Sequence, residues 1–241
     1  MPSSNQSVLE ICAGAGGQAY GLEAAGFDHE IAVEIDRDAA ATLRANRPNW
    51  VVHEGDVRTF SGSAYRGIDL LAGGVPCPPF STAGKQLGAE DERDLFPEAL
   101  RLVDEARPTA VLLENVRGLA STRFRSYRDE IRGTLRKMGY GSSWQLVLSS
   151  DFGVPQLRPR FILVAVQGLP DDVFEWPGAV GSPITIGEAL LPLMASNGWK
   201  GATAWARRAN SVGPTIVGGS KKHGGADLGP SRAKAAWAEL G

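Results

Sequence analysis

The 241-residue sequence predicts an α/β fold: a doubly wound, mostly parallel sheet, followed by the beginning of a small second lobe. Three observations support this prediction. Strand and helix signals alternate from residue 7 to residue 167, as they do in doubly wound sheets. A glycine-rich turn separates the first apolar run from the first helical segment. After about residue 168 the periodicity weakens and Gly, Pro, Trp and Ala dominate, so the sheet is expected to end there.

The elements of the first part follow one another in a regular order. Strands are expected at 7–11, 29–34, 68–72, 110–113, 144–148 and 161–166, with a further short strand that ends near Asp56. Helices are expected at 18–25, 37–45, 97–106 and about 127–138. The last helix is indicated by the helical spacing of its apolar residues and by the Gly139 that closes it. Those apolar residues are Tyr127, Ile131, Leu135 and Met138.

The C-terminal part is expected to be separate from the sheet. Short helices are expected at 186–191 and 231–240, with weak patterning between them. We therefore predict one domain at residues 1–175 and a second, incomplete one at 176–241 that stops before it can build a core.

Composition excludes several classes of protein. No apolar run approaches the roughly 20 residues that a membrane helix needs, and the N-terminus lacks the pattern of a signal peptide. Two cysteines give no disulfide framework, and no Cys/His spacing suggests a metal site. We therefore expect a cytoplasmic protein without a metal. A formal net charge of −2 argues against a protein that coats DNA by charge alone.

A glycine-rich turn and two acids point to a nucleotide-like ligand. Residues 12–17 read Cys-Ala-Gly-Ala-Gly-Gly, and glycines at this place let backbone amides approach a ligand at a helix N-terminus. Glu34 follows Gly14 by 20 residues and ends the second strand, where a carboxylate can accept hydrogen bonds from ribose hydroxyls. Asp56 ends the expected third strand. The spacing is not that of the dinucleotide fingerprint.

Three later segments place reactive side chains at strand ends. The run Gly-Gly-Val-Pro-Cys-Pro-Pro-Phe-Ser at 73–81 presents Cys77 among prolines at the carboxyl edge of the sheet, where open α/β folds bind ligands. Glu114-Asn115-Val116 follows another apolar run, and a later element carries Gln156, Arg158 and Arg160. Together they offer a nucleophile, a proton donor and cationic anchors. The alternatives are a packed cysteine, a capping glutamate and an arginine paired elsewhere.

The order and approximate spacing of these motifs resemble the cytosine-C5 DNA methyltransferases over residues 7–167. The resemblance implies a Rossmann-like fold of the methyltransferase type and S-adenosylmethionine as cofactor, with S-adenosylhomocysteine as product. The cofactor would be bound by Cys12, Ala13, Gly14, Gly16, Gly17, Glu34, Ile35, Asp56, Val57, Pro76 and Leu95. By this resemblance Glu34 would hold the ribose and Asp56 the adenine amino group. The chain departs from the family pattern at Cys12, where phenylalanine is usual, and at Ile35, where an aromatic residue is common.

The resemblance also implies the reaction. Cys77 would add to C6 of a cytosine flipped out of double-stranded DNA, with Glu114, Arg158 and Arg160 as its catalytic partners. Glu114 would hydrogen-bond N3, and an arginine would bind O2. The segment 80–92 resembles the loop that closes over the base, although Pro78 stands where the family has glutamine. Substrate or DNA contacts are expected from Ser81, Lys85, Gln86, Asn115 and Gln156.

Several alternatives remain open. The family continues into a target-recognition region and a closing C-terminal helix, neither of which is convincingly present. The chain is therefore either half of a split enzyme that needs a second polypeptide, or a fragment. Other readings are the tRNA-methylating branch of the family and a non-catalytic DNA-binding or regulatory subunit. A basic run at 117–137 is either a solvated helix face or a phosphate contact.

Overall fold

The structure is a computed structural model that describes residues 6–76, 94–216 and 231–240. The chain divides into two compact units. The first comprises residues 1–146 and 161–175, and the second comprises 147–160 and 176–241. Residues 147–160 therefore group with the C-terminal residues, and the assignment of a functional boundary at 175 stays a prediction.

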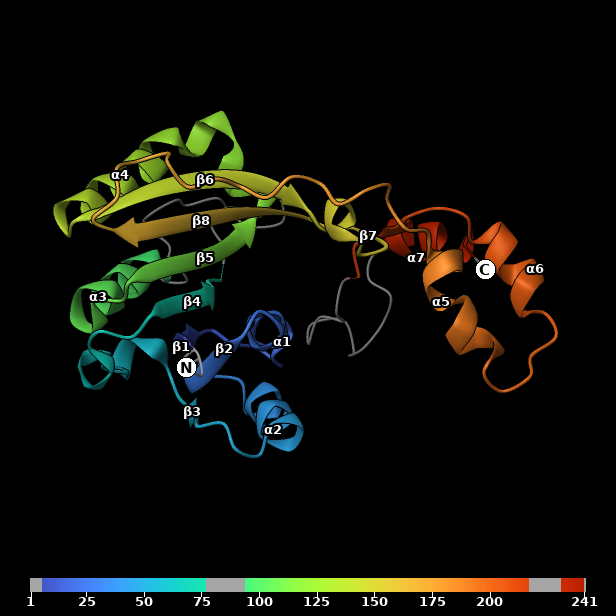
Figure 1. Cartoon of the computed structure of the whole chain (residues 1–241), viewed down its shortest axis with the longest axis horizontal. Helices are drawn as coiled ribbons and strands as arrows, with labels where there is room; N and C mark the ends of the chain where they lie inside the picture. The colour runs from blue at the N-terminus through green and yellow to red at the C-terminus, as the bar shows by residue number, and fades with distance from the viewer. Residues whose placement is uncertain (1–5, 77–93, 217–230, 241) are drawn as a thin grey trace, which may run out of the picture. The chain divides into compact units, whose positions relative to one another are not determined.

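A seven-stranded sheet forms the centre of the first unit (Figure 1), with the strand order β3-β2-β1-β4-β5-β8-β6. Its strands are β1 (Gln6–Ile11), β2 (Phe27–Glu34), β3 (Val52–Glu54), β4 (Leu70–Gly74), β5 (Ala110–Val116), β6 (Tyr140–Leu148) and β8 (Pro159–Gln167). The pairs β1–β2, β2–β3, β1–β4 and β4–β5 are parallel. The chain winds outward to β3, then returns to β4 on the other side of β1. This reversal creates a topological switch point between β1 and β4, and it confirms the predicted doubly wound fold.

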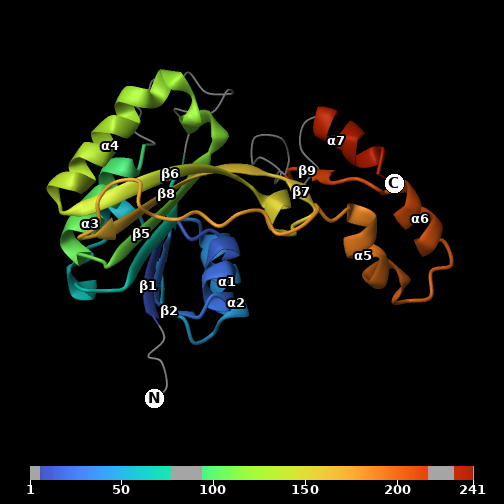
Figure 2. The same ribbon diagram turned by 45° about the horizontal axis from the view of Figure 1, so that its top comes forward.

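Helices cover both faces of this sheet (Figure 2): α1 (Gly17–Ala24) and α2 (Arg37–Asn46) on one side, α3 (Phe96–Ala106) and α4 (Arg125–Lys137) on the other. Alternate residues of β1 point to opposite faces. Leu9 and Ile11 pack in the larger core with residues of α3 and α4, whereas Val8 packs with Leu22 of α1. The predicted helices of this unit are therefore confirmed, with ends that differ by one or two residues.

Strand β6 begins four residues before the expected strand. Gly139 has a φ of +93°, a left-handed conformation that ends α4 and turns the chain at once into the sheet. Tyr140 is then buried, and its hydroxyl donates a hydrogen bond to the Pro108 carbonyl at 2.6 Å. The tyrosine anchors the strand earlier than its apolar pattern indicates.

The second unit contains β7 (Gln156–Leu157), which pairs in parallel with β9 (Gly213–Pro214), and the helices α5 (Ile186–Ala195), α6 (Ala202–Arg208) and α7 (Ser231–Ala238). Ile186, Trp205, Ala209 and Leu240 form a buried apolar cluster, against which Trp237 packs. The expectation that this region stops before it builds a core is therefore wrong, because these helices bury a small core of their own. Helix α6 was not predicted, because its seven residues are too few for a clear helical period.

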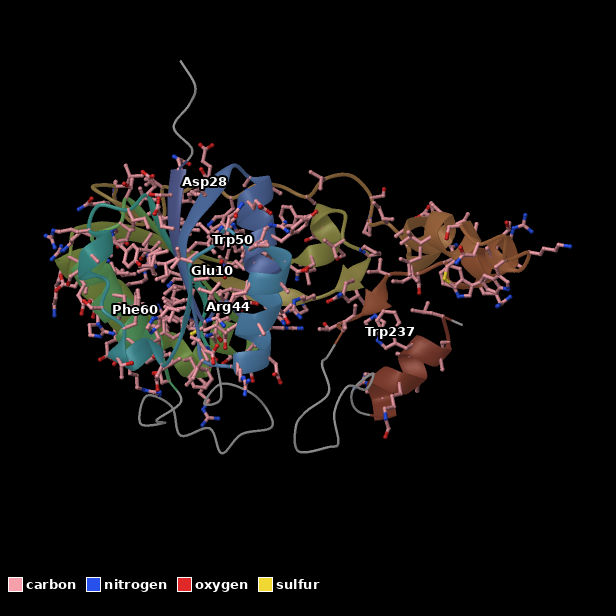
Figure 3. All side chains as sticks on the ribbon, turned by 90° about the horizontal axis from the view of Figure 1, so that it is seen from below. Glu10, Asp28, Arg44, Trp50, Phe60 and Trp237 are labelled. Carbon is pink, nitrogen blue, oxygen red and sulfur yellow. The ribbon has the colours of Figure 1, made fainter. Side chains whose placement is uncertain are left out.

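A polar pair is buried inside the first unit. Glu10 is the penultimate residue of β1 (Figure 3), and its Oε2 is 2.8 Å from Nε2 of His29 on β2. Trp50 stacks on the His29 ring with 4.1 Å between centroids. Among the residues that the structure describes, the buried atoms Glu10 Oε1 and His29 Nδ1 have no hydrogen-bond partner. Burial raises the pKa of Glu10, and the hydrogen bond to His29 only partly opposes this.

Membrane-spanning helices and metal-binding clusters are both absent from the described ranges. Within residues 6–76, 94–216 and 231–240, no helix is both long and apolar enough to cross a membrane. The same ranges hold no cluster of three His, Cys, Asp or Glu side chains arranged to bind a metal ion.

Candidate active site

The glycine turn between β1 and α1 is fastened by Glu34 at the end of β2. Glu34 is buried, and its Oε2 accepts a hydrogen bond from the Gly14 amide at 2.7 Å. Its Oε1 accepts one from the Asp36 amide, also at 2.7 Å. Gly14 has a φ of +56°, a conformation that glycine adopts without strain. The carboxylate thus joins the turn to the end of β2.

The remaining turn residues form its backbone. The Ala13 amide donates to the Val33 carbonyl at 3.2 Å, and Gly16 is the N-cap of α1, which begins at Gly17. A methyl group placed on Gly16 would lie 2.8 Å from Cδ2 of Leu43, so glycine permits close packing against α2. These residues shape the turn.

The third strand is followed by a short 3-10 helix, η1 (Val57–Thr59), which Asp56 caps. Oδ1 of Asp56 accepts a hydrogen bond from the Arg58 amide at 2.9 Å, and Oδ2 pairs with Nη1 of Arg58 at 3.1 Å. The backbone hydrogen bond from Arg58 is the main reason that the pKa of Asp56 is lowered. Asp56 is therefore ionised and oriented by its neighbour.

Arg101 links this short helix to α3. Its Nη2 donates to the carbonyls of Val57 and Phe60, each at 3.0 Å. Arg101 also pairs with Glu98 at 2.7 Å and with Glu105 at 2.5 Å. Sequence reasoning did not find Arg101, because hydrogen bonds to distant carbonyls leave no spacing signal.

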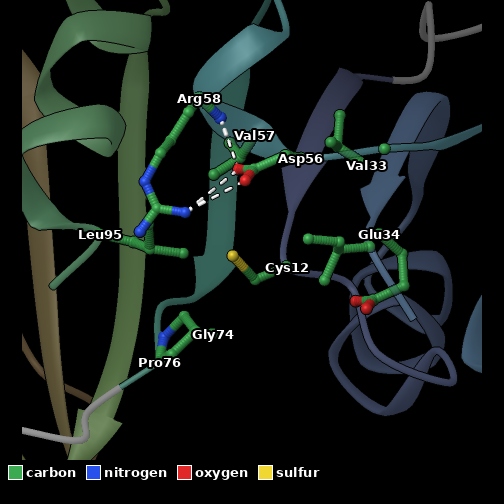
Figure 4. Close-up of a pocket in the computed structure, with 11 residues that line it drawn as sticks. Cys12, Val33, Glu34, Asp56, Val57, Arg58, Gly74, Pro76 and Leu95 are labelled. Atoms are coloured by element: carbon green, nitrogen blue, oxygen red, sulfur yellow. Dashed lines mark hydrogen bonds and ion pairs between the residues drawn. The ribbon is translucent and has the colours of Figure 1, made fainter. Parts of the chain in front are cut away.

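A cavity of about 360 Å³ opens at the switch point between these elements (Figure 4). It is lined by Cys12, Val33, Glu34, Ile35, Gly55, Asp56, Val57, Arg58, Gly74, Pro76 and Leu95. Seven of the eleven residues predicted for the cofactor therefore meet around one cavity. The other four form the glycine turn and do not line it. Arg58 also lines the cavity and was not predicted from the sequence. Its position two residues after the predicted Asp56 could have indicated that it lies in the same pocket.

The Cys12 thiol lies in this cavity, directly after the end of β1 (Figure 4). Burial raises the pKa of the thiol to about 12, and the nearby carboxylates of Glu34 and Asp56 add to the effect. A thiol with this pKa is protonated at neutral pH and is a poor nucleophile. Cys12 therefore acts as a small wall residue.

The end of β4 is held close to its neighbours. A methyl group on Gly73 would lie 2.6 Å from Cγ1 of Ile11, so only glycine allows β1 and β4 to approach in this way. The strand continues through Gly74 to Pro76, which lines the cavity. Cys77, Ser81, Lys85 and Gln86, the next predicted site residues, lie outside the described residues.

Glu114 and Asn115 at the end of β5 lie beside this strand. Glu114 is the register partner of Gly74, and a methyl group on Gly74 would lie 3.7 Å from its Oε2. Asn115 is buried; its amide nitrogen donates to the Val75 carbonyl at 3.3 Å, and its amide oxygen accepts from Val116 at 2.8 Å. The carboxylate thus lies at the strand end that leads to Cys77, and Asn115 holds that strand end in place.

The other predicted residues belong to the second unit. Gln156 lies in β7, Arg160 in β8, and Arg158 between the two strands. The Arg158 amide donates to the Gln156 carbonyl at 2.9 Å, and the Arg158 carbonyl accepts from Ser149. The Arg160 guanidinium donates to the Pro159 carbonyl at 2.8 Å.

Three arginines of the basic run on α4 have structural partners. Arg128 donates to the carbonyls of Leu119 and Ser121. Arg132 pairs with Asp172 at 2.7 Å, and Arg136 pairs with Asp171. For these three residues the structure supports a packing role.

Comparison with known proteins identifies the family. The family model "C-5 cytosine-specific DNA methylase" matches residues 6–180. The chain is 60% identical over 237 residues to the type II methyltransferase M.NaeI of Lentzea aerocolonigenes, covering 97% of this chain and 57% of that protein. It is 56% identical over 210 residues to M.NgoMIV of Neisseria gonorrhoeae, covering 87% of this chain and 67% of that protein. The chain thus spans between 57% and 67% of the length of these two relatives.

Solved structures agree with this assignment. The chain is similar, with a TM-score of 0.65 and 29% identity, to a prophage-encoded E. coli protein described as a DNA modification methyltransferase, covering 77% of this chain and 54% of that one. A DNMT2 structure from Spodoptera frugiperda, with a TM-score of 0.60 and 24% identity over 75% of this chain and 58% of that chain, shows the same fold. The family match, the identities and the shared fold agree with the arrangement of the site, and the chain belongs to the C-5 cytosine-specific DNA methylase family.

Proposed function

We propose that the protein transfers a methyl group from S-adenosylmethionine to C5 of cytosine in double-stranded DNA, as the modification enzyme of a type II restriction–modification system. One observation carries the proposal. The cavity lined by Glu34 and Asp56 lies at the switch point, and the Glu114 carboxylate lies beside the strand that runs on from this cavity to Cys77. This arrangement supports the proposal, because the proposed cofactor pocket and the proposed proton donor both lie at the strand end that precedes the proposed nucleophile.

The chemistry of the lining residues fits the proposed cofactor. Glu34 and Asp56 offer carboxylate acceptors for ribose hydroxyls and for the adenine amino group, and apolar side chains such as Val57 and Leu95 offer walls for a flat ring. The glycine turn brings backbone amides to the N-terminus of α1. When bound, S-adenosylmethionine supplies an electrophilic methyl group on a sulfonium.

The reaction needs covalent catalysis, because C5 of cytosine is a weak nucleophile. In the proposed mechanism the Cys77 thiolate adds to C6, which makes C5 electron-rich. Glu114 hydrogen-bonds N3 and relieves the negative charge that this addition places on the ring. Arg158 and Arg160 are proposed to bind the O2 side and order the site. After C5 is substituted, its proton leaves to a base and the thiolate departs. The target base must first be flipped out of the duplex.

The charge distribution supports DNA as the substrate. Residues 147–160 and 176–241 carry nine Lys and Arg against four Asp and Glu, whereas the first unit carries 16 against 23. A cationic unit attached to an acidic one suits phosphate contact by the former. We therefore propose that residues 176–241 begin the target-recognition lobe, and that residues 1–175 form the catalytic domain. The proposed substrate is bacterial DNA, so the proposed compartment is the cytoplasm.

A covalent trap tests the proposal. The chain is incubated with S-adenosylmethionine and duplex DNA that contains 5-fluorocytosine, in which fluorine cannot leave as a proton does. We expect a denaturant-stable adduct that the Cys77→Ser variant does not form, while a Cys12→Ser variant serves as the matched control and still forms it. A tRNA arm distinguishes the RNA-methylating branch, and added cell extract tests the proposal of a second polypeptide. An adduct that persists in Cys77→Ser would contradict the mechanism.

A further inference from the structure

The proposed cofactor cavity contains a cation that its function as outlined above does not use. Among the described residues that line the cavity, Arg58 is the one Lys or Arg, alongside the acids Glu34 and Asp56 and a largely apolar wall. Its side chain is 43% exposed, so one part of it faces the open cavity and solvent. A ligand that occupies this cavity would therefore lie within reach of the Arg58 side chain.

The guanidinium is oriented by Asp56 (Figure 4). Its Nη1 is 3.1 Å from Oδ2 and 3.4 Å from Oδ1 of Asp56, while Oδ1 also accepts the Arg58 amide. An arginine whose edge is bound by a carboxylate offers its flat face to other groups. A planar, electron-rich ring is the partner that such a face binds best.

The backbone that carries both residues is fixed from outside the cavity. Arg101 donates to the carbonyls of Val57, the first residue of η1, and Phe60, the residue after its end. Asp56 and Arg58 therefore project from a short helix whose geometry does not depend on a ligand. The pair is preorganised, which reduces the entropy lost when a ligand binds.

We propose that Arg58 is a further cofactor-binding residue, whose guanidinium stacks on the adenine ring while Asp56 accepts the adenine amino group. The inference rests on the proposed function, since it deepens the same site. Asp56 can serve both partners because a carboxylate oxygen has more than one lone pair. Arg58 thus pairs with Asp56 and forms one wall for the base.

The size of the effect follows from the exposure of Arg58. Cation–π contacts strengthen binding about two- to fivefold at exposed sites and about thirtyfold when desolvated. A half-exposed guanidinium lies between these limits, so its removal should weaken adenine binding about three- to tenfold. Adenosine and S-adenosylhomocysteine should lose affinity by similar factors, because both carry the same base.

Calorimetric titration of the full chain with adenosine and with S-adenosylhomocysteine tests the inference. The variants are Arg58→Met and Arg58→Lys, and Arg44→Met is the matched control. Arg44 on α2 makes a comparable exposed ion pair, with 2.8 Å between its Nη1 and Oε2 of Glu54 on β3, but it does not line the cavity. Thermal unfolding of each variant shows whether the fold is kept.

The expected result is a three- to tenfold loss for both probes in Arg58→Met, a smaller loss in Arg58→Lys, and wild-type affinity in Arg44→Met. Unchanged adenosine affinity in Arg58→Met would overturn the inference but leave the proposed function standing. Tighter binding would overturn it as well, because it would mean that Arg58 competes with the ligand for Asp56. If the wild-type chain binds neither probe, the proposed cofactor fails, and the inference fails with it.

Discussion

Replacing Glu34 by glutamine tests how the glycine turn is held. The Glu34 carboxylate accepts two backbone hydrogen bonds of 2.7 Å, from Gly14 and from Asp36, in a buried position. A glutamine amide has one oxygen and one NH₂ group, so it can accept from only one of these amides. The second backbone N–H, of Gly14 or of Asp36, then faces the glutamine NH₂ group and loses its acceptor.

The expected change in the free energy of unfolding follows from these two hydrogen bonds. A buried N–H left without an acceptor costs about 1–3 kcal/mol. The remaining hydrogen bond loses its charge assistance, which removes about a further 1 kcal/mol. We therefore expect Glu34→Gln to lower the free energy of unfolding by about 2–4 kcal/mol. Loss of the carboxylate acceptor proposed for the ribose should also weaken S-adenosylhomocysteine binding by about tenfold or more.

Urea unfolding and calorimetric titration measure the two effects. Glu54→Gln is the matched control, because Glu54 is the register partner of Glu34 on β3 and makes an exposed ion pair with Arg44. Exposed pairs of this kind contribute about 0–1 kcal/mol, so the control should stay close to wild type. An ordinary surface substitution changes the free energy of unfolding by up to about 0.5 kcal/mol. If the free energies of unfolding of Glu34→Gln and of the control differ by no more than this, the reasoning about the turn is refuted.

Three further predictions follow from the first unit. The raised pKa of Glu10 means that the folded state binds a proton more tightly than the unfolded state, so its stabilisation is present below pH 4.5 and is lost as pH rises. In urea unfolding at pH 4 to 7, Glu10→Gln should therefore gain stability relative to wild type with rising pH; a constant difference would contradict this. Cys12, with a pKa of about 12, should resist iodoacetamide at pH 8 in a native Cys77→Ser background and react after denaturation, as peptide mass spectrometry would show. Arg101→Met should lower the free energy of unfolding by about 2 kcal/mol in the same urea assay, since it removes two hydrogen bonds from a charged donor to carbonyls; a change below about 0.5 kcal/mol would show that η1 does not depend on Arg101.

The fold was predictable because its signals are local. Apolar runs ending in glycine or acid marked the strands. Glu34 and Asp56 could be found because Glu34 ends a strand and Asp56 lies two residues after one. The carboxyl ends of parallel strands meet at one edge, so strand-terminal side chains converge without further information. The same argument placed Glu114 beside the end of β4.

The features that could not be predicted depend on contacts between residues that have no regular spacing in the sequence. Arg101 reaches carbonyls more than 40 positions earlier in the chain, and a bond to the backbone carries no residue-type signature. Strand β9 has two residues, and its pairing with β7 joins segments 57 positions apart. The small core of the second unit forms from Ile186, Trp205 and Leu240, which are too widely spaced to show a pattern.

The two acids proposed to bind the cofactor also serve the fold. Glu34 binds the amides of the glycine turn, and Asp56 caps η1 and pairs with Arg58. A variant of either acid therefore changes the shape of the pocket together with its ligand contacts, and a loss of binding in such a variant cannot be assigned to the contact alone. Arg58 differs, because its guanidinium pairs with a partly exposed carboxylate and such pairs contribute little to stability. Arg58→Met should leave the turn, the cap and the free energy of unfolding nearly unchanged. Its effect on adenosine affinity is therefore the measurement in this pocket that reports most directly on ligand contact.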